Sequence, residues 1–96
     1  MIDAGDSKAV KAELKTHKLK RERELEELRE VLSKPIGRAV IWRVLEYCGV
    51  YRLSYTGLAS STDFREGHRD VGLWLLSEIH KANPSAYIQM QQELSI

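Results

Sequence analysis

The side chains that could bind a metal or move a proton in this chain are three histidines, His17, His68 and His80, and one thiol, Cys48. No two of these four residues stand at the short, regular spacing of zinc ligands. Glu66 and His68 are two positions apart, so on a helix they point about 160° away from each other and cannot act as an acid–base pair. The chain contains no phosphate-binding loop, no serine nucleophile elbow and no HExxH zinc motif. We therefore expect no enzymatic activity, no cofactor and no bound metal.

His68 allows two interpretations, because the helical pattern places it on an apolar face. A histidine there is typically a neutral, hydrogen-bonded core residue; the alternative is a ligand-binding or switch role. Cys48 stands in an apolar context and has no second cysteine with which to form a disulfide. It is most simply a small buried hydrophobic residue in a protein of a reducing compartment.

Length and composition describe one small domain. The 96 residues are 43% hydrophobic and 30% charged, with a formal net charge of +1. At this size roughly 60 to 65% of the unfolded chain's surface can be buried, which allows a modest core but no enclosed active-site cavity. The near-neutral charge argues against attraction of the whole molecule to DNA or anionic lipid. Because no run of 18 apolar residues and no signal peptide is present, we expect a soluble protein made in the cytoplasm, without membrane contact.

Helical periodicity interrupted by Gly and Pro predicts an all-α fold, a small helical bundle. The four expected helices cover about 7–32, 34–48, 62–82 and 84–94, and one irregular loop covers 49–61. In a single domain, 1–96, we expect residues 1–32 to form a charged, partly protruding N-terminal helix. Residues 33–96 then form a compact helical core.

Polar residues, glycine and proline set the expected helix boundaries. Ser33 is the expected N-cap of the second helix, and Pro35 lies in its first turn. Gly49 is the expected residue after its C-terminus. Several residues could cap the third helix, Ser60, Ser61, Thr62 and Asp63, and Asp63 with Glu66 fits a capping box. Asn83 is the expected cap of the fourth helix, with the following proline at its first position.

The third expected helix is the one around which the others should pack. Its apolar face holds, at 100° per residue, Phe64, Val71, Leu75, Ile79 and Ala82. Leu73 projects instead from the polar face, which we expect to meet solvent or a partner. Gly67 and Gly72 on the margins of the apolar face would allow close helix approach, as would Gly37 on the second helix.

The second expected helix has an apolar arc wider than an exposed helix needs, so we expect it to be covered on two sides. The arc holds Ile36, Val40, Ile41, Val44, Leu45, Tyr47 and Cys48. Trp42 lies outside the arc, beside Arg38 and Arg43. It is either covered by the first or last helix or exposed as an anchor for a partner.

The N-terminal helix carries a narrow apolar stripe, the pattern of a helix that contacts one neighbour. The stripe is formed by Val10, Leu14, His17, Arg21, Leu25, Leu28 and Leu32. The neighbour is either the rest of this domain or another chain.

Charge along this helix is segregated. The first half holds Lys8, Lys11, Lys15, Lys18, Lys20 and Arg21 against one acid, Glu13, and the second half holds Glu22, Glu24, Glu26, Glu27 and Glu30. This order opposes the helix dipole, which favours acids at the start. One interpretation is a solvated face with an accidental charge order. Another is two charge patches for different partners, such as antiparallel copies of the chain. A third is contact of the basic half with nucleic acid.

Two motifs resemble a family of small tailed-bacteriophage proteins of the Bordetella podovirus type, encoded among the head and tail structural genes. Residues 34–45 (KPIGRAVIWRVL) and 64–72 (FREGHRDVG) are similar to the family patterns GR-x-V-x-WR-x-L and F-REG-R-x-VG. The resemblance covers about residues 31–93. His68 and Asp70 depart from the pattern, which has Arg and Asn at those positions.

The resemblance implies a phage protein of the virion-assembly module without catalytic activity. We therefore predict a small, non-enzymatic virion structural or assembly protein that is synthesised in the host cytoplasm and located in the virion. It would bind other phage proteins, such as portal, head–tail neck or internal core components, in several copies. Two alternatives are a nucleic-acid-binding accessory protein that uses the basic N-terminal helix, and an early-infection factor that binds a host protein.

Four sets of residues are the candidates for these contacts. The candidate interface is Trp42, Arg43, Leu73 and Arg38. The candidate salt-bridge residues, within the domain or between subunits, are Arg65, Glu66 and Arg69. The close-packing glycines are Gly37, Gly67 and Gly72. The candidate electrostatic docking residues, which could also make weak DNA contact, are Lys8, Lys11, Lys15, Lys18 and Arg21.

Overall fold

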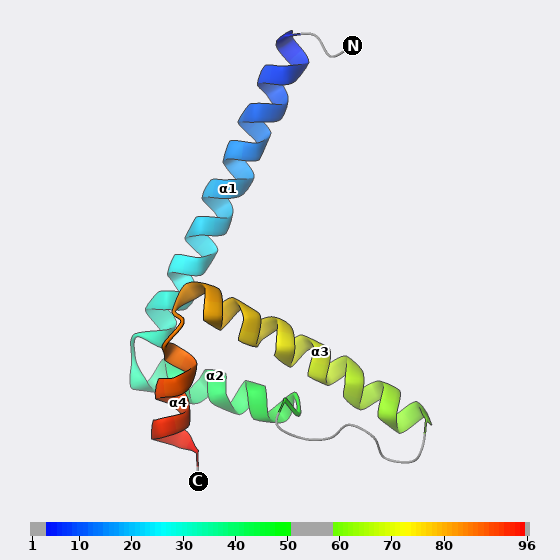
Figure 1. The fold of residues 1–96 in the computed structure, drawn as a ribbon, viewed down its shortest axis with the longest axis vertical. Coiled ribbons are helices and arrows are strands. Elements are labelled where there is room, and N and C mark those ends of the chain that lie inside the picture. The colour runs from blue at the N-terminus through cyan, green and yellow to red at the C-terminus, as the bar shows by residue number, and fades with distance from the viewer. Residues whose placement is uncertain (1–3, 51–58, 96) are drawn as a thin grey trace.

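A computed structural model describes residues 4–50 and 59–95, with side chains from 7–50 and 65–95. Its four helices are α1 (Ala4–Leu32), α2 (Pro35–Tyr47), α3 (Ala59–Ala82) and α4 (Ala86–Leu94) (Figure 1). No strand occurs among these described residues, so the predicted all-α class is confirmed. Most of the predicted irregular loop, residues 51–58, lies outside the described residues.

The turn between α1 and α2 is one residue longer than predicted, because α2 starts at Pro35. Lys34 is the N-cap of α2 and makes no side-chain capping hydrogen bond, while Pro35 is the first helical residue. The Ser33 hydroxyl donates instead to the Glu30 carbonyl oxygen at 2.6 Å. The prediction of Ser33 as the N-cap is therefore wrong: its side chain satisfies a carbonyl at the end of α1, one of the groups that a helix terminus leaves without an internal partner.

Two of the other predicted boundaries also move. Because α3 begins at Ala59, Asp63 lies inside the helix and the predicted capping box does not form. Helix α4 begins at Ala86, and Ser85 is its N-cap. The Asn83 side-chain oxygen accepts hydrogen bonds from the Ser85 amide at 3.1 Å and from its hydroxyl at 3.0 Å, so Asn83 stabilises the turn before α4 and does not cap the helix. Gly49 has a φ of +72° after the end of α2, as its predicted role requires.

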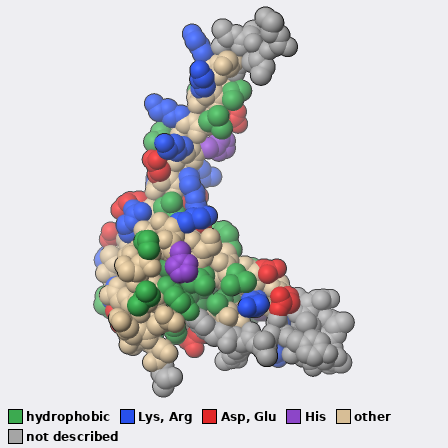
Figure 2. Space-filling view, in the orientation of Figure 1, with side chains coloured by type: hydrophobic (Ala, Val, Ile, Leu, Met, Phe, Trp, Pro, Cys, Tyr) green, Lys and Arg blue, Asp and Glu red, His purple; other side chains and the backbone are tan. Residues whose placement is uncertain are grey.

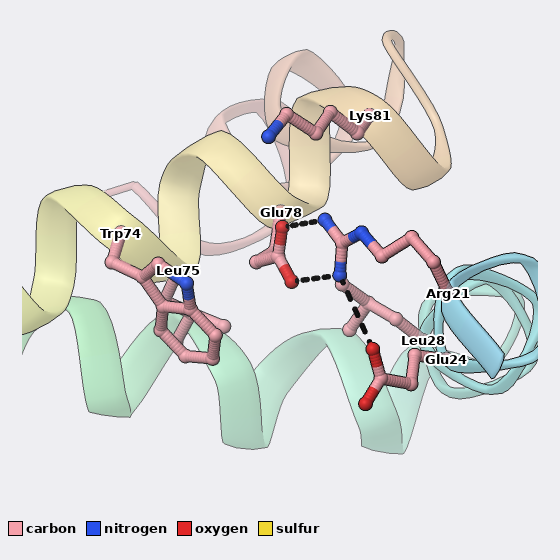
Figure 3. Close-up of a pocket in the computed structure, with 7 residues that line it drawn as sticks. All are labelled: Arg21, Glu24, Leu28, Trp74, Leu75, Glu78 and Lys81. Atoms are coloured by element: carbon pink, nitrogen blue, oxygen red, sulfur yellow. Dashed lines mark hydrogen bonds and ion pairs between the residues drawn. The ribbon is translucent and has the colours of Figure 1, made fainter. Parts of the chain in front are cut away.

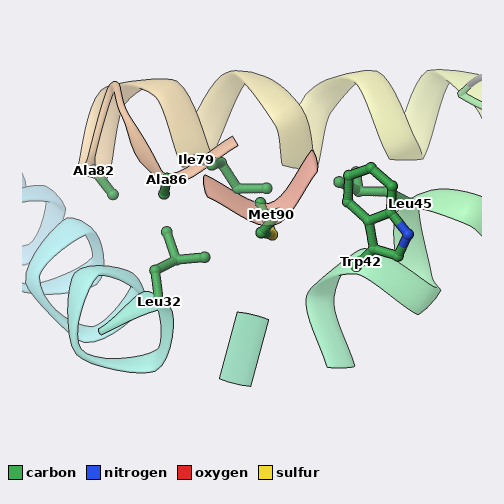
Figure 4. Packing of buried hydrophobic residues seen from close by; sticks show 7 residues of the cluster. All are labelled: Leu32, Trp42, Leu45, Ile79, Ala82, Ala86 and Met90. Atoms are coloured by element: carbon green, nitrogen blue, oxygen red, sulfur yellow. The ribbon is translucent and has the colours of Figure 1, made fainter. Parts of the chain in front are cut away.

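All four helices contribute to one core. Its buried members are Leu32, Trp42, Leu45, Ile79, Ala82, Ala86 and Met90 (Figure 4). Leu32 ends α1, and the aliphatic side chains of α3 and α4 close over it. The core therefore lies where the C-terminal ends of α1 and α3 meet α2 and α4.

The buried face of α2 includes Leu45 and Cys48 of the predicted apolar arc but not the rest of it. Arg38, Trp42 and Leu45 face inward, whereas Ile36 is 81% and Tyr47 is 78% exposed. The expectation that the whole arc is covered on two sides is therefore wrong. Long-range contacts decide the orientation: the guanidinium of Arg38 and the indole of Trp42 both have partners on α4, described below.

The buried face of α3 is also turned relative to the prediction. Ile79 and Ala82 are buried as expected, but Val71 is exposed and Gly72 is buried. A Cβ at Gly72 would lie 2.7 Å from Cβ of Cys48, so the missing side chain lets the end of α2 approach α3. The side chain of Phe64 lies outside the described residues.

Helix α1 continues well past the other helices (Figure 1). Residues 8–20, which we call the protruding segment, are all exposed, and the chain extends over 57 × 38 × 16 Å. Over the residues described, none of the helices has the length and apolar content to cross a membrane.

Candidate docking site

The residues that could do chemistry are separated in the fold. His17 lies on the protruding segment, where it is 3.6 Å from Glu13, and Cys48 is buried at the end of α2. The His68 ring is half-buried and its centroid is 5.5 Å from that of Tyr47. His80 packs edge-on against Tyr87 with 5.8 Å between the ring centroids. Within 4–50 and 59–95, no group of three or more His, Cys, Asp or Glu could hold a metal ion.

A bidentate ion pair joins α1 to α3. The Arg21 guanidinium donates to both carboxylate oxygens of Glu78, with 2.6 Å between Nη1 and Oε1 (Figure 3). Glu24 on α1 is 3.6 Å from the same guanidinium. The hydrogen bond from Arg21 lowers the pKa of Glu78 against the opposing effect of burial. The same hydrogen bond raises the pKa of Arg21.

An open groove of about 440 Å³ lies beside this ion pair, between α1 and α3. Its lining residues are Arg21, Glu24, Leu28, Trp74, Leu75, Glu78 and Lys81 (Figure 3). Leu28 and Leu75 contribute apolar surface to the groove, and Arg21, Glu24, Glu78 and Lys81 contribute charged groups. Trp74 is 61% exposed, which is unusual for the largest apolar side chain.

On α1, the apolar stripe continues from the groove onto the protruding segment. Its C-terminal members pack against the core, with Leu32 buried and Leu25 and Leu28 partly buried. Its N-terminal members, Val10 and Leu14, are exposed. Figure 2 shows hydrophobic side chains along the side of the protruding segment that faces α3, and most of the basic ones on the other side.

On α3, a second exposed apolar strip starts at the same ion pair. Val71 and Trp74 precede Glu78 by seven and four residues, so all three share one face of the helix. Both apolar residues are exposed. We call the angle between the two helices the crook; its walls are Val10 and Leu14 on α1 and Val71 and Trp74 on α3, and the Arg21–Glu78 pair stands at its vertex.

Two of the four predicted interface residues, Trp42 and Arg38, are buried within this chain and offer no exposed contact. For Trp42 the observed state is the first of the two interpretations, cover by another helix. Trp42 packs beside Tyr87 of α4, with 6.2 Å between ring centroids, so it is covered by the last helix. Arg38 donates to the two carboxylate oxygens of Glu93 at 3.0 and 2.7 Å and to the Leu32 carbonyl at 3.0 Å. These contacts tie α1, α2 and α4 together.

The other two predicted interface residues are exposed, Arg43 on α2 and Leu73 on α3. They lie on different helices and neither lines the groove. Leu73 is one residue from Trp74, about 100° around the helix from it. The exposed apolar surface of α3 is therefore wider than predicted, because it includes Trp74 as well as Leu73.

The predicted salt-bridge residues form no ion pair with any described residue. Arg65 is exposed, and Glu66 and Arg69 are half-buried. The Nε atom of Arg69 is buried without a hydrogen-bond partner among the described residues. The intramolecular salt bridges that join helices use Arg21 and Arg38 instead, whose acidic partners lie more than 50 residues further along the chain.

Two of the three predicted glycines stand at close contacts. A Cβ at Gly37 would lie 2.9 Å from the Val31 carbonyl carbon, and Gly72 meets the end of α2 as described above. At Gly67 a Cβ would meet no atom of a described residue within 4 Å, so no described helix makes the predicted close approach there.

The predicted electrostatic docking residues fall into two groups, four exposed lysines and one arginine held in an ion pair. Lys8, Lys11, Lys15 and Lys18 are exposed on the protruding segment. Arg21 is half-buried and is engaged by Glu78, so its assignment as a docking residue is corrected to a structural ion pair.

Sequence reasoning missed Trp74 and Glu78. The run 73–76 (LWLL) offered a signal, because four consecutive large apolar residues cannot all lie on one face of a helix. Arg21 offered another, because an arginine inside an apolar stripe needs an acidic partner when the stripe is covered.

Comparison with known proteins gives one family. The model of the family described as Bbp19-like phage protein matches residues 28–92. The matched segment contains the whole of α2 and α3 and most of α4, and it leaves out the protruding segment. No curated protein and no solved structure matches the chain.

Proposed function

The chain belongs to the family of Bbp19-like phage proteins, and on that premise we propose that it is a non-enzymatic structural or assembly protein of the virion that binds other phage proteins. The observation that supports this proposal is the protruding segment. A helix with an apolar stripe gains little stability in water until the stripe is covered. This chain covers only the part of the stripe that runs from Arg21 to Leu32.

The partners that fit this role are other components of the particle, such as the portal, the head–tail neck or the internal core. A particle presents the same surface many times. Several copies of a small subunit can therefore bind to it and bury their exposed apolar residues there. Exposed large apolar residues on all four helices support the proposal, because soluble monomers rarely expose large apolar patches without a function.

The direct test is to purify particles and search for this chain by quantitative mass spectrometry. We expect it in washed particles at a fixed ratio to the portal protein. Recovery only from infected-cell lysate would contradict the virion role and favour an early-infection factor that binds a host protein.

A point variant tests whether the exposed surface matters for incorporation. Leu73→Glu places a charge on an exposed apolar position, so the protein should remain folded while its copy number in particles falls several-fold. Ser77→Glu, on an exposed position of the same helix, is the matched control. Equal incorporation of both variants and wild type would remove Leu73 from the contact.

One observation favours a second candidate function, a nucleic-acid-binding accessory role. The protruding segment presents five lysines to solvent, Lys8, Lys11, Lys15, Lys18 and Lys20. If they contact phosphates, the chain should shift duplex DNA with a steep salt dependence. Reversing Lys11 and Lys15 to Glu should then abolish the shift; absence of a shift with the wild-type chain at low salt would exclude this role.

A further inference from the structure

We propose that the crook binds one amphipathic helix of another protein, with its apolar edge against both walls and with Asp or Glu on its flanks. The inference rests on the proposed function and names the chemistry of the partner segment.

The walls of the crook supply an apolar contact from two helices. Val10 and Leu14 are 52% and 63% exposed, and Val71 and Trp74 are 56% and 61% exposed. Tryptophan at the centre of such a surface is a frequent energetic hot spot of protein interfaces. Because the groove at the vertex is open and about 440 Å³ in volume, apolar side chains of a helix lying over it can enter.

The dimensions of the crook match a helix. Leu14 precedes Arg21 by seven residues and Val71 precedes Glu78 by seven residues. At 1.5 Å per residue, each apolar side chain stands roughly 10 Å along its wall from the ion pair, and an α-helix with side chains is about 10–12 Å wide. A helix laid across the vertex therefore reaches Leu14 on one side and Val71 and Trp74 on the other.

The charge of the α1 wall selects an acidic partner. Residues 8–20 contain five lysines and one acid, whereas Asp70 and Lys81 on α3 balance each other. Lys11 and Lys18 flank the apolar stripe, since they lie within about 80° of its centre line at 100° per residue. Acidic flanks on the incoming helix would pair with them and increase the rate of association.

The protruding segment of a second copy fits the crook poorly. Among the described residues it is the helical stretch that projects beyond the core of its own chain. That stretch carries the same excess of positive charge, so two such segments side by side would repel each other.

Site-specific photocrosslinking in infected cells tests the inference. A photoreactive amino acid replaces Leu14 in one variant, Trp74 in a second and Ile36 in a third, and crosslinked peptides are sequenced from purified particles. Ile36 is the control, because it is exposed and apolar but lies on α2, away from the groove. We expect positions 14 and 74 to join the same segment, with apolar residues at helical spacing and Asp or Glu beside them, and position 36 not to join it.

Charge reversal provides the second measurement. In the variant with the photoreactive residue at position 74, Lys18→Glu should lower the yield of that crosslink about fivefold, and Arg43→Glu, an exposed reversal on α2, should leave it unchanged. Equal yields would remove the electrostatic part of the proposal.

Four results would overturn the inference: crosslinks from positions 14 and 74 to a second copy of this chain, to nucleic acid, to a segment without acidic residues, or to nothing while the chain is present in particles. The last result would leave the virion role intact and reject only the crook. Absence of the chain from particles would reject the virion role itself.

Discussion

The two halves of α1 have the same stripe but different surroundings. In the half from Arg21 to Leu32, the arginine is paired with Glu78 and the leucine is 1% exposed. In the half from Lys8 to Lys20, every residue is exposed, including Leu14 at 63%. Helix α3 lies beside the first of these halves only (Figure 1).

This difference teaches that a periodic apolar stripe predicts a contact without saying which molecule provides it. The C-terminal half of α1 is stabilised by contacts with its own chain. The N-terminal half is helical but makes no tertiary contact with the other described residues. A helix in that situation is marginally stable in water and gains order when a partner covers it.

The largest expected effect contrasts one leucine from each half. Leu32→Ala should lower the free energy of unfolding by about 3 kcal/mol, because it leaves a cavity where all four helices meet. Leu14→Ala should change it by less than about 0.5 kcal/mol, because that side chain is exposed. Urea unfolding monitored by circular dichroism measures both. Similar losses for the two variants would show that α1 is covered along its whole length.

The next effect concerns the contacts that tie the end of α1 to α2 and α4. Arg38→Ala should cost about 2 kcal/mol, because it leaves the Leu32 carbonyl without its buried hydrogen-bond partner and Glu93 without its ion pair. Arg43→Ala, five residues along the same helix and exposed, should stay within about 0.5 kcal/mol. The same urea titration applies. If Arg38→Ala is neutral, these contacts do not hold α1 to the core.

A smaller effect should appear when acid is added. The pKa of Glu78 is lower in the folded chain than its ordinary value of 4.5, so the unfolded chain binds more protons between the two values. The stability from the Arg21–Glu78 pair is therefore complete above pH 4.5 and is lost as pH falls below it. The pair between Arg38 and Glu93 acts in the same direction.

The measurement is the thermal unfolding midpoint between pH 6 and pH 3 for wild type and for Glu78→Gln. The variant should be less stable at pH 6 and should lose less of its remaining stability on acidification. Glu22→Gln, an exposed acid on α1, should retain the wild-type slope. Parallel curves for wild type and Glu78→Gln would mean that the pair does not stabilise the fold.

The smallest effect is expected from removing the protruding segment. Deletion of residues 1–17 should change the free energy of unfolding of the remaining chain by less than about 0.5 kcal/mol, because residues 8–17 bury nothing against the core. In the full chain, amides of residues 8–18 should exchange with deuterium much faster than those of residues 24–32. A loss well above that value would place the segment against its own core.

Sequence reasoning succeeded where a feature depends on near neighbours. The all-α class, the break at Pro35 and the glycine at the end of α2 follow from periodicity and backbone preference, and the structure contains all three. It failed at the boundaries of α3 and α4, because several polar residues compete for the capping role and only the surrounding packing selects one.

It also failed on which face of each helix is buried. The predicted arc of α2 placed Ile36 and Tyr47 inside. Arg38 and Trp42 are buried instead, because they contact Glu93 and Tyr87 on α4. A single helix does not contain that information, since the partners lie 45 residues or more away in the chain.

The sequence by itself determined that this chain forms helices, where its first helix carries a stripe, and that its charges are segregated along it. The tertiary structure decided which half of the stripe is covered, which faces of α2 and α3 turn inward, and that Arg21 and Glu78 meet at the vertex of the crook. The physical reason is range: helical periodicity arises within a few residues, whereas buried ion pairs and close helix contacts join residues that only folding brings together.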